Sequence, residues 1–347
     1  MTAETVSSSK TWLAWVFREM FRAMHNQEQD NFDDVRYPEA QRNAFFADMH
    51  AWYLGFLTEN ADAFYAARSL LEDDASRDLF DRLVLYRLLG HLHVRLPVRH
   101  RSVVPAEWKI DDTGDAGMLG QLCVFSVPYA GSDVWVKCVP SNVAATFLSD
   151  QYRFDRGGVR IMAEPGDYVI DGGGCFGDTA LAFAADIGAS GRVYTFDPIL
   201  KHCEIMREAF QMNPQLASRI SLFDVGLSDT NTERDAAHCG PQSINPGARL
   251  EEGLPTLTID SLTASGEVEK IDFLKMDIEG SELGALKGGE QSLRQWRPRL
   301  AISLYHRPED LFSIPLWLGS LGSGYRFFLN HHSIHQEETV LYATAAV

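Results

Sequence analysis

A glycine-rich turn stands between a predicted strand and a predicted helix near the middle of the chain. The run Tyr168-Val-Ile-Asp-Gly-Gly-Gly-Cys-Phe-Gly-Asp-Thr179 ends the apolar strand at Asp171 and leads into an apolar helix. Such a turn lets a ligand lie against bare backbone at a helix N-terminus. It predicts a site for a nucleoside-bearing cofactor. The residues expected to bind it are Asp171, Gly172, Gly173, Gly174, Cys175, Gly177, Asp178 and Thr179.

A second acid, Asp197, follows the next predicted strand, residues 192–196. It comes about 25 residues after the first acid, a spacing that suits a carboxylate binding the hydroxyls of a ribose. Dinucleotide sites usually keep the first strand apolar and place a diphosphate on the helix. The acid at Asp171 instead favours a cofactor with positive charge, such as the amino group and sulfonium of S-adenosylmethionine.

Two later strands lead to residues that could perform catalysis. Residues 273–276 are followed by Asp277, and residues 300–304 are followed by His306. Ligands of open α/β sheets bind at the carboxyl ends of the strands, so we expect Asp277 and His306 to face one cleft. A histidine with a pKa near neutral can take a proton from a hydroxyl. We therefore expect His306 to be the general base and Asp277 to orient it or the acceptor.

Three carboxylates, Asp277, Glu279 and Glu282, are close together in the sequence. Carboxylate oxygens of this kind could hold a divalent metal. The alternative is a solvated acidic loop that caps a helix. The sequence leaves metal dependence open, and we assign no residue as a metal ligand.

The hydrophobic pattern changes near residue 160. Earlier residues show helical periodicity, with Ser76 a candidate N-cap for a helix over 77–92, then a connector at 97–118 and two strand candidates. Later residues alternate strands with helices, which predicts a doubly wound, mainly parallel sheet. We therefore expect a mainly helical N-terminal domain with a few strands over 1–160 and a cofactor-binding domain over 161–347.

The second domain is expected to contain seven strands, at residues 168–171, 192–196, 220–225, 273–276, 300–304, 325–329 and 339–342. The link between the last two is short, so they should pair as a hairpin with one strand antiparallel to the rest. This predicts an α/β fold with the Rossmann-like sheet of class I S-adenosylmethionine-dependent methyltransferases, which differs from the dehydrogenase fold.

Composition limits the class of partner. The net charge of -17 disfavours nucleic acid as a substrate, because phosphate binding needs a basic face. Five scattered cysteines without a C-x-x-C motif indicate reduced thiols in a cytoplasmic protein. The sequence contains no run of about 18 apolar residues, so it predicts no membrane span. We expect a cytoplasmic enzyme that acts on a small molecule, not on nucleic acid or a membrane.

The motifs jointly resemble the FkbM-type methyltransferases, a branch of the class I enzymes. The matching segments are Val169-Ile-Asp-Gly-Gly-Gly-Cys-Phe-Gly-Asp-Thr179, Tyr194-Thr-Phe-Asp-Pro198, Asp272-Phe-Leu-Lys-Met-Asp-Ile-Glu-Gly-Ser-Glu282, Pro298-Arg-Leu-Ala-Ile-Ser-Leu-Tyr-His306 and Glu338-Thr-Val-Leu-Tyr-Ala343. The resemblance implies methyl transfer from S-adenosyl-L-methionine, most often to oxygen on a sugar, polyketide or other secondary metabolite. Family members commonly have glutamate where this chain has Asp197.

Given this resemblance, the glycine loop should hold the methionine and ribose portions of the cofactor and Asp197 the ribose hydroxyls. Asp224 and Val225, at the end of the third strand, would border the adenine. The long polar segment 229–255 is expected to form a lid over the acceptor. The helical N-terminal region would supply another wall of the pocket or a contact between copies in a homo-oligomer.

Two alternatives remain on the sequence alone. One is an NAD(P)-dependent oxidoreductase, although its phosphate loop would not normally begin with an acid. The other is a non-catalytic protein that binds S-adenosylmethionine on a degenerate methyltransferase fold. Nucleic-acid amino-methylation usually has Pro-Pro-aromatic after the residue at position 277, where this chain has Ile278-Glu279-Gly280.

Overall fold

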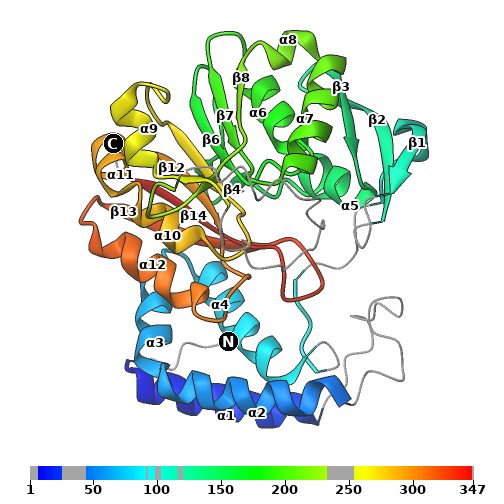
Figure 1. Cartoon of the computed structure of the whole chain (residues 1–347). Coiled ribbons are helices and arrows are strands. Elements are labelled where there is room, and N and C mark those ends of the chain that lie inside the picture. Colours follow the sequence, from blue (N-terminus) through cyan, green and yellow to red (C-terminus); the bar gives the residue numbers. More distant parts are fainter. Residues whose placement is uncertain are drawn as a thin grey trace.

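The computed structural model describes residues 7–25, 44–90, 93–97, 103–115, 120–232 and 254–345. Its centre is a seven-stranded sheet with the strand order β13-β14-β12-β11-β6-β7-β8 (Figure 1). β14 runs antiparallel to both of its neighbours, and the remaining pairs are parallel. The predicted class I methyltransferase fold is confirmed, including the C-terminal hairpin. The strands are β6 (Tyr168–Gly172), β7 (Arg192–Phe196), β8 (Ile220–Phe223), β11 (Phe273–Met276), β12 (Arg299–Ser303), β13 (Tyr325–His331) and β14 (Thr339–Ala345).

Helices cover both faces of this sheet, because successive strand residues point to opposite faces. Val169 and Phe273 pack with Phe183 of α6 on one face. Ile170 and Leu274 belong to the largest core cluster, on the other face. The helices after β6 are α6 (Asp178–Asp186), α7 (Leu200–Met212), α8 (Pro214–Ala217), α9 (Ile259–Ser265), α10 (Glu282–Lys287), α11 (Glu290–Trp296) and α12 (Asp310–Ser320).

The N-terminal helices share their core with the sheet. They are α1 (Ser9–Met24), α2 (Ala44–Glu59), α3 (Ala61–Leu70) and α4 (Asp74–Leu89), and they lie beside α12 at the lower end of Figure 1. Trp12 and Phe64 belong to the same buried cluster as Leu300 and Phe327. The division near residue 160 stays a prediction, but the described residues on its two sides do not form separate cores.

Residues 103–115 and 120–161 add a second layer beside α6 and α7. A 3₁₀ turn (Ala106–Trp108) leads into a three-stranded antiparallel sheet of β1 (Lys109–Asp115), β2 (Gln121–Tyr129) and β3 (Ser132–Cys138). β1 falls within the segment 97–118, which was predicted as a connector. It was not predicted as a strand, because its sequence lacks the apolar alternation of a half-buried strand. Val127 and Val136 of this sheet pack against Leu181 of α6 and Ile205 of α7. The chain then continues through α5 (Pro140–Val143) and a π-helical turn (Ala144–Leu148). A hairpin of β4 (Phe154–Arg156) and β5 (Val159–Ile161) comes next.

One helix start differs from the prediction. Asp73, not Ser76, is the N-cap of α4, and its carboxylate accepts a hydrogen bond of 2.7 Å from the Ser76 backbone. Ser76 lies inside the first turn, where its hydroxyl accepts a hydrogen bond of 2.8 Å from Leu329 N in β13. The hydroxyl that sequence analysis assigned to the cap therefore joins the helix to the sheet.

Most of the segment predicted as a lid, 229–255, is not described by the structure, because residues 233–253 lie outside the described residues. Its two flanks meet where β9 (Gly226–Leu227) pairs with β10 (Thr256–Leu257). Among the helices that the structure describes, none combines the length and hydrophobicity needed to span a membrane.

Candidate functional site

The glycine loop after β6 lies tightly against the ends of β7 and β11. Gly173 N and Gly174 N donate hydrogen bonds of 2.9 and 3.1 Å to Phe196 O. Gly173 has a φ of +81°, and a Cβ atom there would lie 1.9 Å from the carbonyl oxygen of Asp277. A Cβ at Gly174 would lie 2.3 Å from the Thr195 hydroxyl. These positions therefore require glycine, and the loop backbone touches the strand that carries Asp277.

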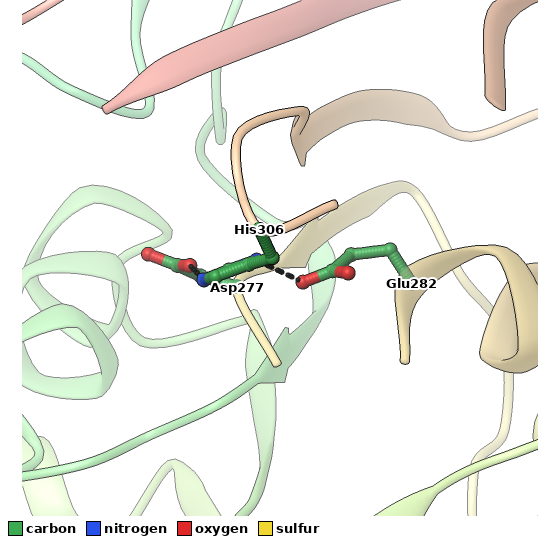
Figure 2. Close-up of side chains that lie close together, drawn as sticks. All are labelled: Asp277, Glu282 and His306. Atoms are coloured by element: carbon green, nitrogen blue, oxygen red, sulfur yellow. Dashed lines mark ion pairs between the residues drawn. The ribbon is translucent and has the colours of Figure 1, made fainter. Parts of the chain in front are cut away.

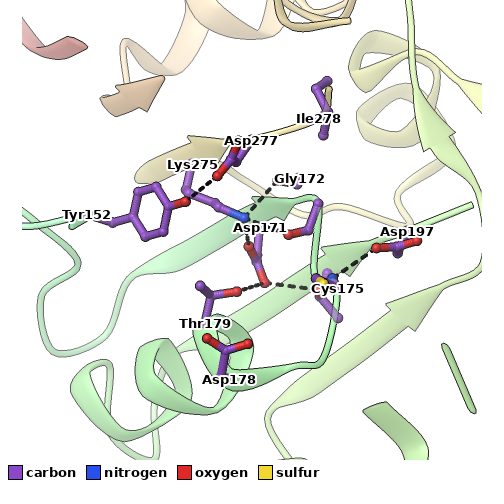
Figure 3. A network of polar contacts seen from close by, with 12 residues as sticks. Tyr152, Asp171, Gly172, Cys175, Asp178, Thr179, Asp197, Lys275, Asp277 and Ile278 are labelled. Carbon is purple, nitrogen blue, oxygen red and sulfur yellow. Dashed lines mark hydrogen bonds and ion pairs between the residues drawn. The ribbon is translucent and has the colours of Figure 1, made fainter. Parts of the chain in front are cut away.

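The acid at the end of β6 is paired inside the protein. Asp171 is fully buried, and its Oδ1 lies 2.9 Å from Lys275 Nζ (Figure 3). Its Oδ2 accepts hydrogen bonds of 2.9 Å from Thr179 and 3.0 Å from Thr195. Sequence analysis assigned the positive partner of Asp171 to the cofactor, whereas the structure assigns it to Lys275. Asp171 and Thr179 thus position the loop from inside the protein.

Lys275 connects this ion pair to the loop backbone. It is buried in β11, and Nζ donates hydrogen bonds of 2.9 Å to Gly172 O and 2.7 Å to Gly173 O. One ammonium group therefore holds both the acid and the first turn of the loop in place. Burial would lower the pKa of Lys275, but the charges of Asp171 and Asp277 raise it overall, so the side chain stays charged.

Asp197 closes the other side of the loop. Its Oδ2 accepts a hydrogen bond of 2.9 Å from Cys175 N and lies 3.0 Å from His202 Nδ1. Its Oδ1 accepts one of 2.9 Å from Ile199 N. The carboxylate therefore joins the loop to the start of α7, and its predicted contact with a ribose stays a prediction.

Asp224 and Val225 directly follow β8, the neighbour of β7 in the sheet. Both are partly exposed, and the Asp224 carboxylate lies 4.0 Å from Arg207. The structure thus places the first three strand ends of the predicted site along one edge. The predicted contact with an adenine ring is not tested by this placement.

A segment that precedes β6 crosses the same edge; we call residues 144–153 the strap. Its Thr146 hydroxyl donates a hydrogen bond of 2.5 Å to the buried carboxylate of Asp178, at the start of α6. Its Tyr152 hydroxyl donates one of 2.7 Å to Asp277 (Figure 3). The strap therefore contacts both the glycine-loop side and the Asp277 side of the site.

Asp277 is the centre of the second half of the site. Oδ2 accepts the hydrogen bond from Tyr152, and Oδ1 accepts one of 2.8 Å from the Tyr305 hydroxyl. His306 Nε2 lies 3.3 Å from the same Oδ1. Burial would raise the pKa of Asp277, but the charges of His306 and Lys275 and the two phenols lower it overall. Asp277 is therefore stable as a carboxylate and binds a proton weakly.

His306 lies between two carboxylates (Figure 2). Nδ1 is 2.8 Å from the fully buried Glu282, and Nε2 faces Asp277 and, at 3.6 Å, Glu279. Burial would lower the pKa of His306, but these carboxylates raise it to about 9. The prediction of a pKa near neutral was wrong, because three acids from the preceding loop and helix surround the ring. At neutral pH His306 holds a proton.

The same residues could be read as a metal site. Asp277, Glu282 and His306 offer ligand atoms that lie within 4.8 Å of one another. Each ring nitrogen of His306, however, lies within ion-pair distance of a carboxylate, and this charge favours a protonated ring over one that presents a lone pair. This geometry is that of an imidazolium held by acids.

Several residues around the site have strained backbone conformations. Four non-glycine residues near it have left-handed φ values, namely Asp150 in the strap, Cys175 in the glycine loop, Glu279 after β11 and Glu338 before β14. Such conformations persist where the surrounding structure holds them, and they cluster at functional sites. Four separate segments thus meet at one edge of the sheet with their backbones tightly constrained.

Several residues of this network were not among the predicted site residues. Lys275 lies two residues before Asp277, and the alternation of side chains along β11 could have indicated it. Tyr305 directly precedes His306, just after β12. Glu338 directly precedes the last predicted strand, residues 339–342. Tyr152 had no signal in the sequence, because its partner, Asp277, is 125 residues away.

Comparison with known proteins agrees with this geometry. Residues 171–327 match the model of the methyltransferase FkbM domain. No significant match was found among curated proteins. The structure is similar to that of a methyltransferase FkbM from Methylobacillus flagellatus KT, with a TM-score of 0.55 and 20% identity, over 83% of this chain and 60% of that protein. The chain therefore spans less than two thirds of that relative.

Other matches are more distant. Fibrillarin from Aeropyrum pernix, solved with natively bound S-adenosyl-L-methionine, matches 71% of this chain and 100% of its own at 12% identity and a TM-score of 0.36. A precorrin-6y C5,15-methyltransferase from Geobacter metallireducens GS-15 matches 58% of this chain and 87% of its own at 10% identity and a TM-score of 0.36. The resemblance predicted from the motifs is confirmed, since residues 171–327 match the model of the methyltransferase FkbM domain.

Proposed function

We propose that this protein is an S-adenosyl-L-methionine-dependent methyltransferase that methylates a hydroxyl group of a small molecule, such as a sugar, a polyketide or another secondary metabolite. The observation that carries the proposal is the charge around the glycine loop. Asp171, Asp178 and Asp197 surround it, and its cation, Lys275, is buried and engaged by Asp171 and two carbonyls. A diphosphate would be repelled here, whereas an amino acid with a sulfonium would not.

The residues present fit this cofactor. The loop offers bare backbone at Gly173 and Gly174, followed by the N-terminus of α6, which begins at Asp178 without a side-chain cap. Asp197 stands where a carboxylate could exchange its internal partners for ribose hydroxyls. Bound S-adenosyl-L-methionine would supply an activated methyl group, so the protein needs only to hold it, position the acceptor and remove a proton.

In this proposal Asp277 orients the acceptor. Its carboxylate has spare lone pairs beside those used by Tyr152 and Tyr305, and its side chain is 19% exposed. His306 holds the carboxylate in place as a fixed cation, and buried Glu282 holds His306. The role of general base, predicted for His306, does not suit a ring that is protonated up to about pH 9.

Replacing His306 with glutamine should lower kcat by about 100-fold, the loss expected when a group that orients the acceptor is displaced by about 1 Å. Glutamine keeps a polar side chain but loses the positive charge that fixes Asp277. Binding of S-adenosylhomocysteine should change little, because His306 does not contact the glycine loop. Turnover can be measured by transfer of a radiolabelled methyl group to a panel of hydroxylated acceptors.

The matched control is His25→Gln. His25 caps α1, and within the residues that the structure describes its ring bonds only to the backbone of the same helix. This variant should keep wild-type turnover. Equal turnover of His306→Gln and wild type would remove His306 from the proposed mechanism.

The proposal places the protein in the cytoplasm, since the four cysteines described by the structure are free thiols. An NAD(P)-dependent oxidoreductase is the competing function. It would require the acidic loop to accept a diphosphate, and it does not explain the antiparallel β14.

A further inference from the structure

Glu338 enters the site from the β13–β14 hairpin. It directly precedes β14 and has a φ of +68°, a conformation that costs energy for a residue with a side chain. Its Oε2 accepts a hydrogen bond from the amide of Gln151 in the strap. The residue after Gln151 is Tyr152, which binds Asp277. Two consecutive strap residues therefore bind Glu338 and Asp277, and these two carboxylates are near enough to repel each other.

Glu338 differs from the other acids of the site in having no cation of its own. Asp171 is paired with Lys275, and Asp277 lies beside His306. Within the described part of the chain, no lysine, arginine or histidine lies within ion-pair distance of Glu338; its hydrogen-bond partner there is the neutral Gln151. Glu338 is partly exposed, so its carboxyl group can exchange protons with water.

The groups that face Glu338 come from each neighbouring segment. Asp277 and the adjacent Glu337 contribute negative charge, and His306 contributes a positive charge that opposes them. The neutral phenols of Tyr152 and Tyr305 also lie near it. Burial, followed by Asp277 and Glu337, raises the pKa of Glu338 to about 8. The carboxylate therefore has a much higher affinity for a proton than Asp277 has.

We propose that Glu338 is the proton acceptor of the methyl-transfer reaction. The inference rests on the proposed function and adds a catalytic residue to it. As the acceptor oxygen forms its bond to the methyl carbon, the bond from that carbon to sulfur breaks, and the electron pair remains on sulfur. The proton of the acceptor hydroxyl passes to Glu338, which later releases it to solvent. The products are a methyl ether and S-adenosylhomocysteine.

The alternatives at this edge are less suitable for physical reasons. Asp277 is stabilised as a carboxylate by two phenols and the positive charge of His306, so it binds a proton weakly. His306 already holds a proton at neutral pH. A base works best when its pKa lies near the working pH. Among these three groups, Glu338 is the one that meets this condition.

Replacing Glu338 with glutamine should lower kcat by about 100-fold to 10,000-fold, the usual contribution of a general base. Glutamine keeps the size and one acceptor oxygen for Gln151. Affinity for S-adenosylhomocysteine and the thermal unfolding midpoint should stay within error of wild type. The dependence of kcat on pH gives the sharper result. Wild-type kcat should rise through about pH 8 as Glu338 loses its proton, and the variant should lack this rise.

Glu337→Gln serves as a directional control. It removes one of the negative charges that raise the pKa of Glu338. The rise of kcat should therefore move to lower pH while its plateau is kept. An infrared titration of the protonated-carboxyl band gives a readout independent of turnover. A component of the band should disappear through about pH 8 in wild type and be missing from the spectrum of Glu338→Gln, whereas the component from Asp310, whose pKa is raised to about 7, should be present in both.

The outcomes separate the two proposals. If wild type binds no S-adenosylhomocysteine, the proposed function fails. If wild type binds it and turns over, while Glu338→Gln keeps wild-type kcat and the same rise with pH, the assignment of Glu338 is overturned. A loss of kcat together with a loss of the rise and of the infrared band supports it.

Discussion

Replacing Lys275 with methionine is expected to lower the free energy of unfolding by roughly 3–5 kcal/mol, the cost of leaving one charge of a buried ion pair without its partner. Asp171 is fully buried and would lose the cation that lies 2.9 Å away. The carbonyls of Gly172 and Gly173 would lose their donor as well. Binding of S-adenosylhomocysteine should fall below detection in any variant that still folds. Urea titration and calorimetry measure the two effects.

Lys270→Met is the matched control. Lys270 also pairs with an aspartate, Asp272, at 2.8 Å, but its side chain is 42% exposed. Exposed pairs contribute about 0–1 kcal/mol. The double variant Lys275→Met with Asp171→Leu should recover part of the lost stability, because it removes the unpaired charge. Equal stability of the Lys275 and Lys270 variants would contradict the role assigned to the buried pair.

Replacing Gly173 with alanine should reduce affinity for S-adenosylhomocysteine by about 100-fold or more, since a displacement of about 1 Å at a binding site can cost that much. The added Cβ would lie 1.9 Å from the backbone oxygen of Asp277, and backbone atoms cannot yield as a flexible side chain does. The loop or the end of β11 must move. Because Asp277 directly follows β11, kcat should fall together with affinity.

Gly188→Ala separates this steric effect from backbone strain. Gly188 also has a left-handed φ, +68°, but a Cβ there would meet nothing within 4 Å. This variant should lose only about 1 kcal/mol of stability, the cost of a left-handed alanine, and keep its affinity. If both variants lose affinity equally, the close approach of the loop to β11 is not what shapes the site.

The sheet could be predicted from the sequence because each of its strands carries a local signal. The apolar runs that end at Asp171 and Asp277 became β6 and β11, and the short link after residue 329 gave the hairpin of β13 and β14. β1 could not be predicted, since its polar sequence gains strand geometry only by pairing with β2.

The site was predicted at the level of which strand ends carry it, but not at the level of what each group does. Asp171 and Lys275 are about a hundred residues apart, and periodicity does not show that they meet. His306 was expected to titrate near neutral pH from its residue type alone. Its actual pKa of about 9 depends on Glu282 and Asp277 at specific distances. Tyr152 reaches the site only because the strap crosses the sheet edge.

The central claim is that this glycine loop binds S-adenosyl-L-methionine, and isothermal titration of the purified protein tests it most directly. S-adenosylhomocysteine should bind in the micromolar range, and Asp197→Ala, which removes the acid that closes the loop, should abolish that binding. NADH, titrated in parallel, should not bind. Binding of NADH without binding of S-adenosylhomocysteine would contradict the account and favour the oxidoreductase.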